Sequence, residues 1–247
     1  MVNMVNMVGM GTVINAIGVL IGGICGLTFG KFLQQRYQDN LISASSLCVI
    51  FIGITGALQK IFVIEENVLN TTGTMMMIAS LCIGAVIGEW LDIEGHTETF
   101  AAWLKRKSHS EKDPLFIQGF LSTSLTICIG AMAILGPIND ALYHDYTILT
   151  TKGILDAIIV MALTASYGKG CIFSVIPLVA FQGTMTLLAH IIGPFMTEAA
   201  LNNISLVGSM LIFCVGINLI FGKKFKVANM LPALVIAAGY AFIPWLN

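Results

Sequence analysis

The sequence predicts an all-α fold, a polytopic bundle of about eight transmembrane helices, on three observations. Of the 247 residues, 57% are hydrophobic and only 10% are charged, whereas a soluble domain usually carries about 25% charged residues. The mean hydropathy is +0.89. The apolar residues also gather in segments close to the roughly 20 residues that a helix needs to cross a bilayer. The first expected partner is therefore the lipid bilayer.

Eight apolar segments, separated by clusters of polar residues, are the predicted spans. We expect them at 11–30, 41–59, 74–91, 117–137, 152–168, 171–193, 203–222 and 227–246. The first carries no charge before Lys31 and continues too long for a cleaved signal sequence, so we expect it to stay as a spanning helix. None of the breaks is long enough for a second domain. The sequence therefore predicts a single transmembrane domain over 1–247.

The breaks between the spans give the expected orientation, because basic residues are retained on the cytoplasmic side. With the N-terminus outside, the cytoplasmic breaks hold ten of the twelve basic residues, and only Lys60 and Lys152 fall outside. Eight spans then put both termini outside. In the third break, residues 91–107 have an amphipathic pattern that suits a helix lying along the lipid headgroups.

Two segments of opposite predicted orientation resemble each other. ISASSLCVIFIGITGALQK and ISLVGSMLIFCVGINLIFGKK align with Gly53 on Gly216, and Lys60 then meets Lys223. Such an echo is typical of the inverted repeats of transport proteins, whose sites lie where the two halves meet. Apolar helices rich in Gly and Ser share a small alphabet and also align without a repeat. The sequence leaves open whether the similarity is an inverted repeat or a chance similarity of apolar helices.

The first span carries a glycine stripe with four-residue spacing, which places its members on one face of a helix. The stripe consists of Gly18, Gly22, Gly26 and Gly30. The absent side chains allow another backbone to approach to van der Waals contact. Three roles fit the pattern: packing against another span of the chain, the seam of a homodimer, and the lining of a pore.

Asp156 is the unusual residue of the fifth span, since an ionised group inside a membrane is costly unless it faces water or a partner. Asn15 of the first span lies at a similar predicted depth, in INAI against LDAI. A carboxylate beside an amide carbonyl offers hard oxygen ligands suited to Na⁺ or H⁺. In the alternative interpretation, Asp156 caps the helix N-terminus or pairs with Lys152 at the interface.

His190 and Asn218 are further candidate polar residues of the predicted ion or solute path, although a lone His is more often a hydrogen-bonded helix residue. The sequence contains no catalytic motif such as a P-loop, G-x-S-x-G or H-E-x-x-H, so we expect no enzyme and no cofactor. The six cysteines lack metal-site spacing, and we predict no metal centre. Without a basic field, nucleic acid is not an expected partner.

Four stretches resemble one family over nearly the whole chain. They are GTVINAIGVLIGGICGLTFGKFL, GFLSTSLTICIGAMAILGPINDAL, ILDAIIVMALTASYGKGCIFSVIPLVAFQGTMTLLA and VANMLPALVIA. In these stretches the chain is similar to the YqgA-like bacterial integral membrane proteins, a family whose domain has no assigned function. The resemblance implies a protein of the bacterial cytoplasmic membrane, and a cation channel or pump has been suggested for the family.

Together, these observations predict a membrane channel or secondary transporter for a small cation or small solute. Asp156 and Asn15 would line its outer mouth, and a homodimer is one arrangement of the glycine stripe. The alternative is a scaffold or regulatory membrane protein that transports nothing and binds a partner through residues 91–107.

Overall fold

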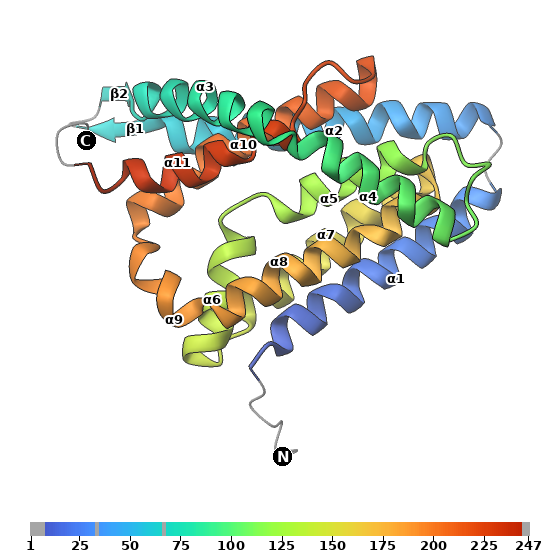
Figure 1. Cartoon of the computed structure of the whole chain (residues 1–247), viewed down its shortest axis with the longest axis horizontal. Coiled ribbons are helices and arrows are strands. Elements are labelled where there is room, and N and C mark those ends of the chain that lie inside the picture. The colour runs from blue at the N-terminus through green and yellow to red at the C-terminus, as the bar shows by residue number, and fades with distance from the viewer. Residues whose placement is uncertain (1–7, 33–34, 66–67, 244–247) are drawn as a thin grey trace. The chain divides into compact units, whose positions relative to one another are not determined.

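The computed structural model of the chain describes residues 8–32, 35–65 and 68–243, and its elements are α-helices apart from short 3₁₀ turns and one hairpin (Figure 1). The helices fall into two compact units. Within the described ranges, six helices are long and apolar enough to cross a membrane, or seven if one bent pair counts as a single span. The predicted fold class, a polytopic transmembrane helix bundle, is confirmed.

The first unit, called the α1–α7 unit below, comprises residues up to 38, 112–128 and 132–195. Its elements are α1 (Met10–Phe32), α5 (Phe116–Cys128), α6 (Met132–Tyr143), α7 (Thr147–Tyr167), the 3₁₀ turn η1 (Lys169–Ser174), α8 (Val175–Leu187), α9 (Ala189–Ile192) and η2 (Gly193–Phe195). Helices α1, α5, α7 and α8 each contribute one side chain to a buried apolar cluster of Val19, Ile127, Val160 and Leu178. This cluster is the centre of the unit.

The glycine stripe of α1 faces α7, which lies beside it (Figure 1). A Cβ atom added to Gly18 would lie 2.6 Å from the carbonyl oxygen of Gly153, and one added to Gly30 would lie 3.1 Å from that of Ala165. Residue numbers rise together along the two helices, so α1 and α7 run parallel. The structure thus places the stripe in a contact between two helices of one chain, where small residues let the backbones approach.

Helices α5 and α6 form the bent pair, with an angle of 57° between them. The predicted span over 117–137 falls on this pair, which is a broken span or a re-entrant loop and not one straight helix. Gly130, in the break, has a φ of +133°, which favours glycine. The helical path stops at Cys128, resumes at Met132 and extends to Tyr143. Pro137 lies inside α6, beyond the break.

The second unit, called the α2–α10 unit, comprises residues 39–111, 129–131 and those from 196 onward. Its elements are α2 (Gln35–Ile61), β1 (Phe62–Glu65), β2 (Val68–Thr71), α3 (Thr74–Leu91), α4 (Ile93–Lys107), α10 (Glu198–Phe221), η3 (Ala228–Met230) and α11 (Pro232–Tyr240). Its buried apolar cluster joins α3, α10 and α11 through Met76, Leu206, Val207, Ala233, Ala237 and Tyr240.

Within this unit, α2 and α10 are the two segments whose sequences resemble each other. A Cβ atom added to Gly53 would lie 2.5 Å from the backbone nitrogen of Phe213, and one added to Gly216 would lie 2.8 Å from that of Ile50. Residue numbers rise along one helix as they fall along the other. The two similar segments therefore pack as an antiparallel pair.

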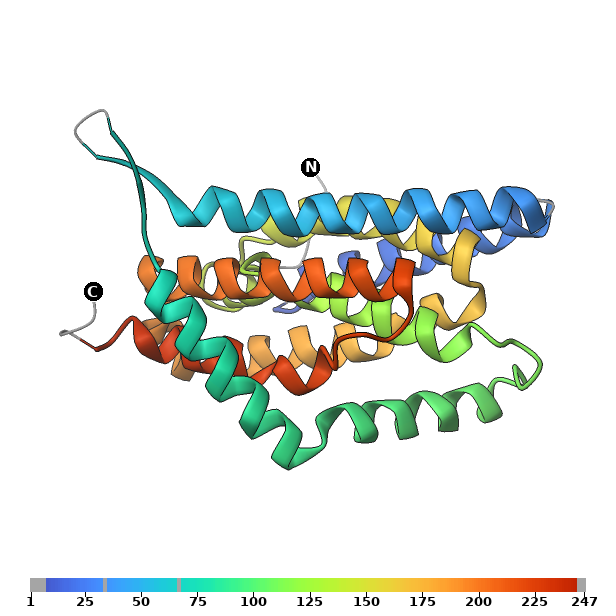
Figure 2. The ribbon, with the colours of Figure 1, turned by 90° about the horizontal axis from the view of Figure 1, so that it is seen from above.

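A polar corner closes the junction of α3 and α4, which meet at an angle at Asp92 (Figure 2). We define it by Glu89, Glu94, Lys223, Lys226 and Asn229. The Asn229 side chain accepts a hydrogen bond from the Glu94 N–H (2.6 Å) and donates one to the Glu89 carboxylate (2.7 Å). Lys223 pairs with Glu94 at 3.0 Å, and Lys226 pairs with Glu89. The corner fixes the start of α4, the predicted amphipathic helix, to the loop after α10.

Two further predicted segments have structure that hydropathy did not specify. The break after the second predicted span contains the antiparallel strands β1 and β2, in which Phe62 faces Thr71. The predicted span 227–246 is not one long helix. Its regular part, α11, has nine residues, or about 14 Å at ~1.5 Å per residue, roughly half a bilayer core. Pro232 starts this helix. Residues 244–246 lie outside the described residues.

Candidate functional site

A buried ion pair lies in the interior of α7. The Lys152 Nζ is 2.8 Å from Asp156 Oδ1 and 2.7 Å from Oδ2, and the two residues are only 7% and 3% exposed. Helix α7 begins at Thr147, five residues before the predicted span. Asp156 is therefore its tenth residue, about 13 Å along the axis at ~1.5 Å per residue, which is too deep to cap the N-terminus. In the structure, Asp156 forms an ion pair with Lys152.

The broken helix supplies the third acceptor of Lys152. The Lys152 Nζ donates to the backbone carbonyl of Ile127, 2.7 Å away and one residue before the end of α5. The last carbonyls of any helix lack an intrahelical partner, so a break inside an apolar unit frees them for other donors. The three N–H groups of the ammonium thus meet three oxygens, two of one carboxylate and one of the backbone.

Asn15 of α1 lies beside Asp156, and the similar membrane depth of the two residues stays a prediction. Its amide lies close enough to stabilise the Asp156 carboxylate, yet neither its oxygen nor its nitrogen makes a hydrogen bond of standard geometry among the described residues. Asn15 is 0% exposed. A Cβ atom on Gly153 would lie 3.1 Å from the Asn15 Cα, so the small residue at 153 permits this approach of α1.

Other buried polar groups of the α1–α7 unit also lack partners. Among the described residues, ten buried side-chain N and O atoms have no hydrogen-bond partner, and all ten belong to this unit. They come from Thr12, Asn15, Thr123, Ser124, Asp140, Thr164, Ser174 and Gln182. Each such atom costs about 1–3 kcal/mol if nothing satisfies it. The α1–α7 unit thus holds a concentration of buried polar side chains, of which Thr123 and Thr164 lie beside the Cys171 thiol.

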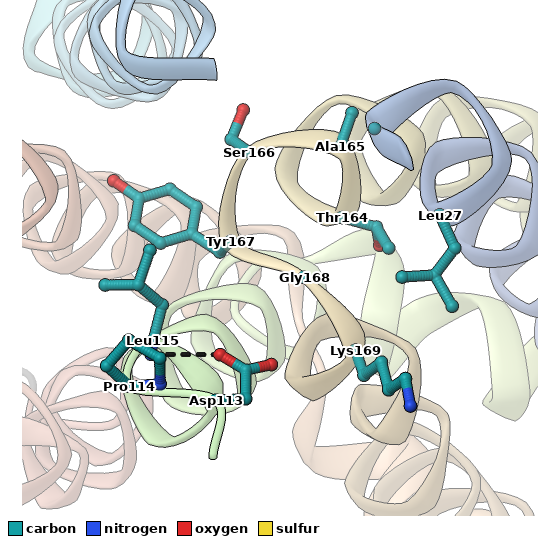
Figure 3. A pocket seen from close by; sticks show the side chains of 11 residues that line it. Leu27, Asp113, Pro114, Leu115, Thr164, Ala165, Ser166, Tyr167, Gly168 and Lys169 are labelled. Carbon is teal, nitrogen blue, oxygen red and sulfur yellow. Dashed lines mark hydrogen bonds between the residues drawn. The ribbon is translucent and has the colours of Figure 1, made fainter. Parts of the chain in front are cut away.

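A cavity of about 410 Å³ opens at the C-terminal ends of α1 and α7 (Figure 3). Figure 3 shows it between Leu27 of α1, the turn around Gly168, and Asp113, whose carboxylate accepts a hydrogen bond from the Leu115 N–H at 3.1 Å. Thr164 also lines the cavity. It follows Asp156 by eight residues on α7, about 12 Å along the axis at ~1.5 Å per residue. Helix α7 therefore carries the ion pair and also lines the cavity.

Two acids stabilise the opposite end of the parallel pair α1 and α7. The Asp140 carboxylate, 1% exposed, accepts a hydrogen bond from the Gly11 N–H at the start of α1 (2.9 Å). Hydrogen bonds from the Thr147 side chain and backbone lower the pKa of Asp145 at the start of α7. Negative charge at a helix N-terminus is favourable. Asp140 was not predicted as a site residue, because INDALYHDYT was assigned to a polar break between two spans. The available signal was an acid three residues after Pro137, at the end of an apolar segment.

His190 and Asn218 do not join Asp156 and Asn15 in this site. His190 is exposed on the short helix α9. Asn218 lies near the end of α10, where its side chain binds the following loop: its Oδ1 accepts from the N–H groups of Lys224 and Phe225 at 2.8 and 2.9 Å. In the part of the chain that the structure describes, no group of three or more His, Cys, Asp or Glu side chains is placed to hold a metal ion.

The chain matches a family model over almost its entire length. The model, described as a protein of unknown function (DUF554), covers residues 10–242. The uncharacterized membrane protein YdfK of Bacillus subtilis is 30% identical over 94% of this chain and 96% of its own length. The uncharacterized protein YqgA of Escherichia coli is 30% identical over 92% and 94%. No solved structure matches significantly. This multi-pass membrane protein therefore belongs to the DUF554 family of YqgA-like membrane proteins.

Proposed function

We propose that the chain is a channel or secondary transporter for a small cation or small solute in the bacterial cytoplasmic membrane, and that the α1–α7 unit carries the path. The supporting observation is the concentration of unpartnered buried polar atoms, together with a buried ion pair, in this one unit. Such groups are costly in a membrane and are typical of ion and substrate pathways. The proposal is for transport and not for an enzymatic reaction.

The path proposed here follows α7. It runs from the region of Asn15 and Asp156 toward Thr164 and the cavity beside Gly168. The broken pair α5–α6 supports this assignment, since non-helical backbone at membrane depth is tolerated where protein or a water-filled cavity satisfies it. Broken helices in transporters commonly expose backbone carbonyls to a coordinated cation. If the chain forms a homodimer, its seam lies on a face other than the glycine stripe, because α7 fills that stripe.

The test is flux through purified full-length protein in liposomes, measured for K⁺, Na⁺ and H⁺ with ion-sensitive dyes. We expect flux above that of protein-free liposomes. Asp156→Asn removes the negative charge that faces the transported cation. The flux should fall on the order of tenfold or more, since a loss of ~1.4 kcal/mol of interaction corresponds to a factor of ten. Glu111→Gln, the same chemical change at an exposed loop residue, is the control and should leave flux unchanged. Equal flux in both variants would refute the role of Asp156.

A second candidate function is a membrane scaffold, favoured by α4. On this helix, Phe100 and Trp103 stack with their ring centroids 5.8 Å apart and are 40% and 48% exposed. Exposed aromatic residues on an amphipathic helix suit either the headgroup region or a partner protein. Photocrosslinking from position 103 in living cells separates the two. Crosslinks to a second protein, together with absent flux in liposomes, would favour the scaffold.

A further inference from the structure

The oxygens that hold the Lys152 ammonium have the composition of a cation site. Nζ lies 2.7–2.8 Å from both oxygens of Asp156 and 2.7 Å from the carbonyl oxygen of Ile127. These are hard oxygen donors, the class that binds alkali cations as well as ammonium groups. A positive charge is favourable between them, because two of the three oxygens belong to a carboxylate.

Asn15 provides the second, independent observation. Its carboxamide is fully buried beside Asp156, and neither polar atom has a standard hydrogen bond among the described residues. The Lys152 ammonium has only three protons, and all three are used by Asp156 and Ile127. The Asn15 amide faces the Asp156 carboxylate through its N–H side, since a carboxylate repels an amide oxygen. The Asn15 Oδ1 is thus a buried oxygen that none of the three Lys152 protons serves.

We propose that Asp156, the Ile127 carbonyl and Asn15 form a binding site for a monovalent cation of the size of ammonium, such as K⁺, and that Lys152 occupies it as a tethered competitor. The charge supports a monovalent ion, because the oxygen set carries a single negative charge. The spacing supports a large one, since Mg²⁺ and Ca²⁺ prefer shorter distances of about 2.0–2.1 and 2.3–2.6 Å. This inference deepens the proposed transport function by naming the ion class and its position.

The tethered competitor explains how such a site releases its ion. Conduction requires binding that is favourable enough for entry and weak enough for exit. A lysine one helical turn away returns to the oxygens as the cation leaves, so the carboxylate is never without a counter-charge. In this arrangement Lys152 weakens cation binding, and its removal strengthens it.

The experiment measures cation-dependent thermal stability of the purified full-length protein. We compare KCl, NaCl, LiCl and choline chloride at equal ionic strength, because a ligand that binds the folded state raises its melting temperature. Lys152→Met should gain stability from K⁺ at concentrations on the order of tenfold lower than the wild type needs, and more from K⁺ than from Li⁺ or choline. Lys152→Met/Asp156→Asn should lose this response. Lys112→Met, at an exposed loop residue, should respond as the wild type does.

Several outcomes would overturn the site. Equal stabilisation of Lys152→Met by choline and K⁺ would mean general screening, and an unchanged response in the double variant would place the cation elsewhere. If Lys152→Met unfolds in choline, K⁺ should restore folding, and failure to do so contradicts the proposal. The liposome assay separates this inference from the transport function. Cation binding without flux would support the cation site and contradict transport. Flux without cation binding would support transport and contradict the cation site.

Discussion

Gly22 lies on the glycine stripe at a point where α1 and α7 approach most closely. A Cβ atom there would overlap the carbonyl oxygen of Ala157, so Gly22→Ala must push the helices apart. We expect a destabilisation of about 1–3 kcal/mol, the usual cost of overpacking. Gly183→Ala on α8 is the control, since its Cβ meets nothing within 4 Å, and it should be neutral or stabilising. Unfolding midpoints of the two variants in mild detergent check this prediction.

Lys152 and Asp156 should show strong coupling in a double-mutant cycle made in choline buffer. Each single change, Lys152→Met or Asp156→Asn, breaks a buried pair and should cost about 3–5 kcal/mol of unfolding free energy. The double variant should cost clearly less than the sum, because neither charge is then left alone. Additive costs would contradict the buried pairing. The free energies come from reversible unfolding in detergent.

The polar corner makes an element-scale prediction about alkaline pH. The hydrogen bond from Lys226 to Glu89 raises the pKa of Lys226 above its ordinary value of 10.5. A raised pKa in the folded state means that the stabilisation is fully present below pH 10.5 and is lost as pH rises through the higher folded value. The wild type should therefore lose more stability than Lys226→Met above pH 10.5. Melting temperatures of both proteins from pH 8 to 12 test this difference.

At the scale of elements, sequence patterns predicted the helices that are long, apolar and bounded by polar breaks. The spans 11–30 and 74–91 correspond closely to α1 and α3, because hydropathy reports burial in lipid directly. The break in 117–137 was missed because Gly130 does not interrupt the apolar run, although its φ of +133° alters the backbone. The end of α11 was missed because the apolar sequence continues past Tyr240 without a polar break.

The candidate site was predictable only in part. Asp156 was found because a lone acid in an apolar run is conspicuous, and Asn15 because its surroundings are similar. The contribution of Ile127 was invisible, since it comes from a backbone carbonyl that only the break exposes. Lys152 was considered a boundary residue because the helix start was placed five residues late. The late start predicted for α7 thus placed Lys152 and Asp156 closer to the end of the helix than they are.

At the scale of the whole molecule, the orientation remains a prediction that labelling can test. We expect the hairpin β1–β2 outside and the end of α4 in the cytoplasm, following the distribution of basic residues. In a variant without its native cysteines, Val68→Cys should react with an impermeant maleimide in intact cells. Ser108→Cys should react only after the membrane is permeabilised. The reverse result would invert the topology.

The contact along the glycine stripe also has a mechanical consequence. Backbones that touch over four successive turns cannot slide along each other without overlap, so α1 and α7 move as one closely packed pair that keeps Asn15 next to Asp156. If the α1–α7 unit changes shape during a work cycle, the displacement then falls to the end of α5, and the Ile127 oxygen is the ligand that travels.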